Sequence, residues 1–318
     1  YYIILLIVKL IIRIFILTFL LYSSALSETI FYQSYNPKNF EEIFSKAFYS
    51  NSVELTGELI LPGKKSKYPV VVLQHGTGDN KNKKNWYKAL SNKLLENGIG
   101  VFINDSYKNR NIKGSELTLA PRVLDGLFAL EAISSHPHVD YSRIGIQGYS
   151  YGGMVAFFTA YKELADLVNN EYAAHMPVYP GCDIVIKHME MTKAPIKMII
   201  AEMDDYAPAI DCIEYGPEIG EIKIYNGAHH GFINTNQKKE FLKDVGHFNN
   251  CERGYIQEDG KWYYNGKVRS GAEKQILSDI WKECGSKGVH IGGTRKHREM
   301  LIRDTVDFFI QELIKDST

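Results

Sequence analysis

Ser150 is the residue with the clearest potential for chemistry, because it lies in the sequence GYSYG at positions 148–152. A serine hydroxyl is a weak nucleophile unless it is exposed, next to a base and close to donors that can hold an oxyanion. The pattern G-x-S-x-G follows an expected strand at residues 143–147, and a helix is expected directly after it. A sharp turn between strand and helix exposes the hydroxyl, so the sequence predicts a nucleophile elbow centred on Ser150.

A serine of this kind needs a histidine base and an acid, which follow an elbow in the order acid and then histidine. Two adjacent acids, Asp204 and Asp205, and two adjacent histidines, His229 and His230, each come directly after an expected strand. Only one member of each pair can join the serine. We expect Asp204 and His230 to complete the triad, with Asp205 solvated or capping.

The loop that follows the expected strand at residues 70–73 reads QHGTG. In enzymes with a nucleophile elbow, the loop after this strand supplies one backbone N–H of the oxyanion hole, and the residue after the nucleophile supplies the other. We assign these donors to Thr77 and Tyr151. Chemistry of this kind requires neither a metal ion nor an organic cofactor, and none is expected.

Short apolar runs alternate with helical patterns from Val53 onward, which predicts a doubly wound, mostly parallel sheet with flanking helices. Strands are expected at residues 70–73, 101–103, 144–146, 198–200 and 222–225, and helices at residues 86–97, 121–135 and 152–167. Residues 234–298 are polar and rich in turns, with a hairpin around residues 255–264, and the chain closes with a helix at 298–314. We interpret 234–298 as an insertion or cap on one domain.

The composition excludes several classes of protein. The chain has 318 residues, of which 45% are hydrophobic, and Lys plus Arg (37) equal Asp plus Glu (37). A disordered or fibrous chain would show fewer apolar residues or a compositional bias. A protein that binds nucleic acid through its phosphates would show a basic excess, so we expect no nucleic-acid partner.

Residues 1–27 differ from the rest of the chain. They contain Lys9 and Arg13 but no acid, then an apolar stretch at 14–22 and small residues at 23–27. This is the layout of a secretory signal peptide, and Ala25 and Ser27 are small residues at the positions that a signal peptidase reads. The alternative is an uncleaved N-terminal anchor. We expect residues 28–318 to be exported, periplasmic or secreted, and not membrane-bound after cleavage.

The set of motifs resembles the dienelactone hydrolase-related branch of the α/β-hydrolase superfamily. The matching segments are QHGTG at 74–78, NDS at 104–106 with Arg110, Arg122 with Asp125, GYSYGG at 148–153, DDYAP at 204–208 and HGF at 230–232. The resemblance implies an α/β-hydrolase fold. Dienelactone hydrolase itself uses a cysteine nucleophile, whereas this chain has Ser150, so the resemblance implies a general carboxylic-ester hydrolase.

Two further groups of residues have structural or functional interpretations. Arg110 could form an ion pair that supports the loops around the site, or it could bind a substrate carboxylate. In an exported protein, the four cysteines are expected to be bridged. Of the three possible pairings we favour Cys182–Cys212, which would join two neighbouring strand ends, with Cys251–Cys284 holding the insertion.

The leading functional hypothesis is therefore an exported serine hydrolase that cleaves small-molecule carboxylic esters or lactones through an acyl-enzyme. The same triad could serve a serine peptidase, although no large propeller or long cap is evident. A catalytically inactive homologue that binds a ligand is the alternative from a different class of protein. The acyl and alcohol groups and the oligomeric state are not readable from the sequence.

Overall fold

The computed structural model describes residues 26–64, 66–77, 84–112, 114–188, 190–215, 219–234 and 238–314. Most of the predicted signal segment lies outside these residues, but Leu26 and Ser27 are the first two residues of a strand. Across the described ranges, no helix is both long and apolar enough to span a membrane.

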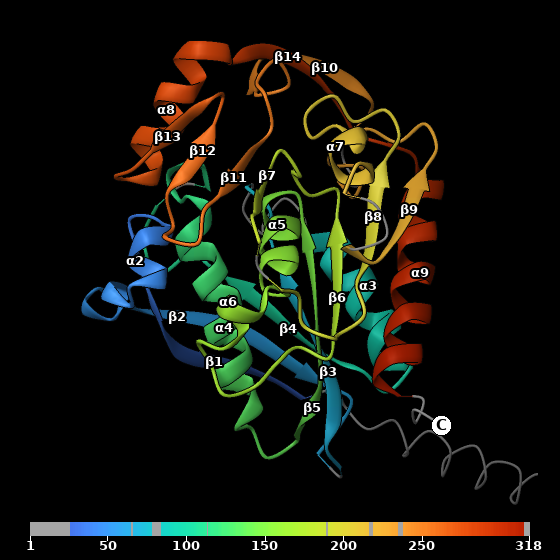
Figure 1. The fold of residues 1–318 in the computed structure, drawn as a ribbon. Coiled ribbons are helices and arrows are strands. Elements are labelled where there is room, and N and C mark those ends of the chain that lie inside the picture. Colours follow the sequence, from blue (N-terminus) through green and yellow to red (C-terminus); the bar gives the residue numbers. More distant parts are fainter. Residues whose placement is uncertain are drawn as a thin grey trace, which may run out of the picture.

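A central sheet of eight described strands forms the framework of the molecule (Figure 1). Their order is β1 (Leu26–Tyr35), β2 (Ser52–Leu61), β4 (Gly100–Asp105), β3 (Tyr68–Gln74), β5 (Val139–Tyr149), β6 (Ala174–Val178), β8 (Lys197–Ala201) and β9 (Glu221–Tyr225). The pairs β1–β2 and β2–β4 are antiparallel, and all the other pairs are parallel. The predicted doubly wound, mostly parallel sheet is confirmed.

The strands expected from apolar runs are present because both of their faces are covered. In β3, Val70 and Val72 join the hydrophobic cluster on one side of the sheet, whereas Val71 and Leu73 join the cluster on the other. β1, β2 and β6 are strands that the apolar runs do not reveal. Residues in β1 alternate between exposed and partly buried over most of its length, as expected at a sheet edge with one face in water.

Helices cover both faces of the sheet (Figure 1). The first cluster includes α4 (Leu119–Ser134), α5 (Tyr151–Phe158) and α2 (Phe40–Phe44), and the second includes α3 (Lys84–Glu96) and α9 (Arg295–Leu313). The remaining described helical segments are η1 (Ala47–Ser50), η3 (Gly114–Glu116), α6 (Lys162–Ala165), α7 (Ala209–Ile213) and α8 (Glu273–Cys284).

The helix predicted at residues 152–167 is wrong as a single element. It is interrupted between α5 and α6, where Tyr161 forms an isolated bridge with Met191 and the Lys162 N–H donates to Glu190 O at 2.8 Å. A segment about 30 residues away in the chain therefore forms hydrogen bonds with backbone groups that a continuous helix would have used. No pattern in the local sequence predicts this interruption.

The segment predicted as a polar insertion, residues 234–298, folds against the carboxyl ends of the strands (orange in Figure 1). It contains β10 (Glu240–His247), β11 (Gly254–Ile256), β12 (Trp262–Tyr264), β13 (Lys267–Arg269), α8 and β14 (Ser286–Ile291). β10 pairs with β14, and β11–β13 form a small sheet with β7 (Ile184–Ile186). The predicted hairpin is present, with Tyr255 opposite Tyr263. The closing helix α9 begins at Arg295 within the segment, capped by Thr294.

Both predicted disulfides are present in the structure. Cys182 is bonded to Cys212, and Cys251 is bonded to Cys284. The first joins the segment after β6 to α7, and the second ties the start of the β11 hairpin to the end of α8. Two disulfides and no free cysteine fit an oxidising compartment.

Glu273 connects the insertion to the main domain. Its side chain is fully buried at the start of α8, and its two carboxylate oxygens accept from the N–H groups of Leu119 and Ala120, 3.2 and 3.0 Å away. The carboxylate thus caps the N-terminus of α4, a favourable place for a negative charge. Burial nevertheless raises the pKa of Glu273 to about 7, against the lowering effect of these N–H groups and of Arg122.

This raised pKa makes stability depend on pH. The folded protein retains a proton on Glu273 that the unfolded chain releases, so the free energy of unfolding falls as pH rises from the ordinary pKa of 4.5 to about 7. We expect a loss of about 2 to 3 kcal/mol between pH 5 and pH 8 from this group. In Glu273→Gln, which keeps an acceptor oxygen, this part of the slope should disappear in urea unfolding at the two pH values. Parallel slopes in both proteins would contradict the assignment.

Candidate active site

Ser150 lies at the turn between β5 and α5 with φ 55° and ψ −120°, a backbone conformation that residues other than glycine rarely adopt. Two glycines permit the turn. A Cβ on Gly148 would overlap the carbonyl of Gly152, and a Cβ on Gly152 would overlap the backbone of Gln74 in β3. The strand, the strained serine and the helix are arranged as the sequence predicts for a nucleophile elbow.

Ser150, His230 and Asp204 form a continuous chain of hydrogen bonds. The Ser150 Oγ lies 2.7 Å from His230 Nε2, and His230 Nδ1 lies 2.8 Å from Asp204 Oδ2. An ionised carboxylate only accepts, so the ring proton belongs on Nδ1, and Nε2 is left to accept from the serine hydroxyl. The other oxygen of Asp204 accepts from the N–H groups of Tyr206 and Ala207 at 2.9 and 2.8 Å, which fixes the carboxylate.

The structure separates the two adjacent candidates in each pair. The Asp205 carboxylate turns away from His230 and contacts His290 instead. Its Oδ1 accepts from the backbone N–H of His290, and its Oδ2 pairs with His290 Nδ1, each at 2.7 Å. His229 points to the same side, where its ring lies 5.5 Å from the His290 ring. The insertion also supports the base, because Gly292 N–H donates to the carbonyl of His230 at 2.8 Å.

The two assigned oxyanion donors come from the loop after β3, which carries Thr77, and from the start of α5, which carries Tyr151. Tyr151 is the first residue of α5, so its N–H has no partner within the helix. Side-chain hydrogen bonds fix the loop that carries Thr77. Tyr107 Oη donates to Gly76 O at 3.1 Å. His75 Nε2 accepts from the N–H of Ser106 at 3.0 Å. His75 is therefore part of the support for this loop.

Arg122 lies against the oxyanion loop, with its Nη1 3.5 Å from Gly76 O, and no carboxylate among the described residues is paired with it. Its buried guanidinium donates to the carbonyl oxygens of Leu117 at 3.2 Å and Gly114 at 3.1 Å, and it stacks on the rings of Tyr107 and Tyr151. Burial lowers its pKa to about 10. Arg122 therefore supports this region through carbonyl groups and aromatic rings.

Arg110 is almost completely buried and does not line the pocket that contains Ser150. Its guanidinium forms a two-pronged ion pair with Asp125 at 2.7 and 2.8 Å and also donates to Asn36 Oδ1, Ser106 O and Tyr35 O. All of its donor directions are used within the protein. Of the two expectations for Arg110, these contacts fit the ion pair and leave no donor for a substrate carboxylate.

Removing this charge is expected to affect stability and not substrate recognition. Arg110→Gln leaves the buried Asp125 carboxylate without its counter-charge, which should reduce the free energy of unfolding by about 3 to 5 kcal/mol. Urea unfolding measures this loss, and the double variant Arg110→Gln/Asp125→Asn should recover part of it. An unchanged stability combined with a higher KM for anionic esters would instead support a substrate role.

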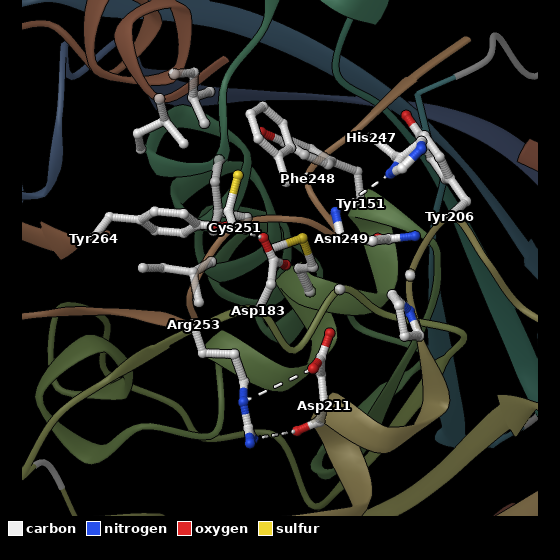
Figure 2. Close-up of a pocket in the computed structure, with 18 of the residues that line it drawn as sticks. Tyr151, Asp183, Tyr206, Asp211, His247, Phe248, Asn249, Cys251, Arg253 and Tyr264 are labelled. Carbon is white, nitrogen blue, oxygen red and sulfur yellow. Dashed lines mark hydrogen bonds and ion pairs between the residues drawn. The ribbon is translucent and has the colours of Figure 1, made fainter. Parts of the chain in front are cut away.

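Ser150 and His230 of the candidate triad line a cavity of about 250 Å³, and other lining residues are labelled in Figure 2. One side is built from the domain itself, including Tyr151, Asp183 and Tyr206, and the other side from the insertion, including Phe248 and Tyr264. Apart from Tyr151, which was assigned as an oxyanion donor, sequence reasoning missed these wall residues. The aromatic run of β12 shows no alternation in the sequence, although in the structure Trp262 and Tyr264 are buried while Tyr263 is partly exposed.

In the part of the chain that the structure describes, no three His, Cys, Asp or Glu side chains gather as metal ligands would.

The features that are present define a class of protein. A mostly parallel sheet, an elbow serine between strand and helix, and a histidine after the last strand of the sheet are those of an α/β-hydrolase. Residues 55–255, more than half of the chain, match the dienelactone hydrolase family, and the chain belongs to this family. It is a hydrolase by that membership.

Several solved structures resemble parts of the fold. Esterase 2 of Thermogutta terrifontis is 16% identical, with a TM-score of 0.48 over 58% of this chain and 83% of that one. Est1E of Butyrivibrio proteoclasticus is 16% identical, with a TM-score of 0.43 over 57% and 88% of the two chains. The dienelactone hydrolase-like promiscuous phosphotriesterase P91 from metagenomic libraries is 16% identical, with a TM-score of 0.46 over 65% and 84%. No curated protein matches the chain.

Proposed function

We propose that this protein is a serine hydrolase that cleaves small carboxylic esters or lactones through an acyl-enzyme intermediate. The observation that carries the proposal is the hydrogen-bond chain from Ser150 Oγ through His230 to Asp204, with distances of 2.7 and 2.8 Å. A hydroxyl within this distance of an imidazole whose second nitrogen faces a carboxylate can be deprotonated as it attacks a carbonyl.

The proposed reaction follows from these positions. Ser150 Oγ attacks the ester carbonyl while its proton moves to His230 Nε2, and the developing oxyanion is held by the N–H groups of Thr77 and Tyr151. The tetrahedral intermediate expels the alcohol, which takes the proton from His230 and leaves an acyl group on Ser150. A water molecule then repeats the attack with His230 as base and releases the acid.

Asp204 has two roles in this proposal. It keeps the imidazole proton on Nδ1, and its negative charge stabilises the imidazolium that forms when the serine proton is transferred. The backbone N–H groups of Tyr206 and Ala207 donate to its other oxygen and hold the carboxylate in place for both roles.

The size of the cavity favours esters over peptides. A volume of about 250 Å³ lies just below the usual range for ligand pockets, and the insertion contributes part of its wall. An extended peptide would need a longer groove on both sides of Ser150. Small acyl and alcohol groups fit this space better, which supports the ester or lactone hypothesis over the peptidase alternative.

A labelling experiment tests the proposal. A fluorophosphonate probe should modify wild-type protein and not Ser150→Ala, and mass spectrometry of the peptides should place the label on Ser150. p-Nitrophenyl esters and lactones of increasing acyl length then define the substrate range. Folded wild-type protein that neither takes up the probe nor cleaves any of these esters would support the inactive, ligand-binding alternative.

We also propose that the protein is exported with residues 1–27 as its signal peptide. The two disulfides support this proposal because such bonds persist in oxidising compartments. N-terminal sequencing of the mature protein tests it. A start near residue 28 is expected, and retention of the apolar segment would favour the anchor.

A further inference from the structure

The lining of the cavity that contains Ser150 includes two acids next to one disulfide. Asp183 follows Cys182 and Asp211 precedes Cys212, and these two cysteines are bonded to each other. Asp183 and Asp211 both line the cavity that contains Ser150. The disulfide thus holds two carboxylates on the same wall, and the charge on Asp183 contributes to a raised pKa of Asp211, after the larger effect of burial.

The two acids differ in their partners (Figure 2). The guanidinium of Arg253 lies 3.8 Å from Asp211 Oδ1 and also contacts Glu214. Asp183 Oδ2 accepts the hydroxyl of Tyr264, at 3.1 Å, and no basic side chain of the described residues is paired with it. Burial raises the pKa of Asp183, with the Tyr264 hydroxyl acting against that effect. A carboxylate in this position lacks the counter-ion that a buried charge normally has.

Aromatic side chains make up much of the remaining wall. They are contributed both by the domain and by the insertion, and they are Tyr151, Tyr206, Phe248, Trp262 and Tyr264. The faces of aromatic rings attract cations, and a combination of rings with a carboxylate is the typical environment for an alkylammonium group. A neutral hydroxyl of a substrate could donate a hydrogen bond to Asp183, but it would leave the charge of the carboxylate uncompensated.

We propose that the substrates of this hydrolase carry an alkylammonium group, which pairs with Asp183 in the aromatic cavity while the ester carbonyl lies at Ser150. This inference rests on the proposed function and adds a substrate class to it. Asp183 is a specificity-determining residue in this view, because it contacts a part of the substrate that does not react.

Pairs of esters that differ only in charge provide the test. One pair carries the charge on the alcohol. It consists of acetylcholine, the acetate ester of choline, and neohexyl acetate, in which carbon replaces the ammonium nitrogen. The other carries it on the acyl group, as the ethyl esters of γ-butyrobetaine and of its carbon isostere. Wild-type protein should prefer the cationic member of at least one pair by about tenfold or more in kcat/KM.

Two variants of the wall then locate the effect. Asp183→Asn should abolish the preference, because kcat/KM should fall about tenfold or more further for the cationic ester than for its uncharged isostere. Asp211→Asn is the matched control, since it removes a neighbouring charge that already has a partner, and the preference should stay within about twofold of wild type. No preference in either pair, or an equal loss for both members in Asp183→Asn, would overturn the proposal.

A binding measurement separates this inference from the proposed function. Calorimetry with Ser150→Ala should show that choline binds more tightly than neohexanol and that the added change Asp183→Asn removes the difference. If uncharged esters are cleaved in a Ser150-dependent manner without any preference for cations, only the present inference fails. If no ester is cleaved and Ser150 takes up no probe, the proposed reaction fails, and choline binding alone decides the role of Asp183.

Discussion

Replacing Ser150 with alanine is expected to lower kcat/KM for ester hydrolysis by about 10⁴-fold or more, with the fold and its stability unchanged. The variant removes the Oγ atom that would carry the acyl group in the proposed acyl-enzyme, and any residual rate would come from water held near His230 and the assigned oxyanion donors. Steady-state kinetics with p-nitrophenyl esters measure the loss. Thermal unfolding and circular dichroism establish that the variant is folded.

A nearby serine serves as the matched control. Ser142 lies in β5, the strand that leads to Ser150, and its exposed hydroxyl donates to Asp140 at 2.7 Å. Ser142→Ala should retain activity within about twofold of wild type. A folded Ser150→Ala that keeps a tenth or more of the wild-type rate would refute the acyl-enzyme mechanism and point to a nucleophile elsewhere.

The second large effect is expected at Asp204. In Asp204→Asn, the amide N–H₂ can donate to His230 Nδ1, which places the ring proton on Nε2. The imidazole then donates toward Ser150 and cannot accept its proton. We expect kcat to fall by about 10³- to 10⁴-fold at neutral pH, with the fold retained.

Asp205→Asn is a stringent control because the two aspartates are adjacent in the chain. Asp205 is half exposed, and its carboxylate pairs with His290 on the insertion instead of His230. Its replacement should change kcat by less than about threefold. Equal losses for the two variants would show that the hydrogen-bond chain seen in the structure is not the one used in the reaction.

The order of the functional elements was predictable from the sequence because it depends on local patterns. A strand covered on both faces is a continuous apolar run, as in β3, and a serine flanked by glycines between a strand and a helix is typical of a nucleophile elbow. The chain order of serine, acid and histidine restricted the partners of Ser150 to two adjacent aspartates and two adjacent histidines. Cys182–Cys212 was predictable for the same reason, since the ends of neighbouring strands lie close together.

Other elements were not predictable because distant segments determine them. The interruption between α5 and α6 is caused by backbone bonds from residues 190 and 191. β1 is an edge strand and β2 is its neighbour, and their partly polar sequences fit a half-solvated surface as well as a loop. The start of α9 uses His297 in its capping box, where the usual sequence signature has Glu or Gln, so the helix begins before its predicted first residue.

The sequence by itself determined the kind of chemistry: a strained serine, a later acid and a later histidine on a parallel sheet. Only the tertiary structure decided which aspartate and which histidine take part. Neighbouring side chains point in different directions, and the Asp205 carboxylate accepts a hydrogen bond from the backbone N–H of His290 in the insertion. The tertiary structure also decided the pocket, because its walls combine a strand end, a disulfide and a hairpin from separate parts of the chain. Local sequence patterns indicate which secondary structure a segment forms. Whether a carboxylate such as Asp183 has a basic partner among the described residues depends on the distant segments that pack around it.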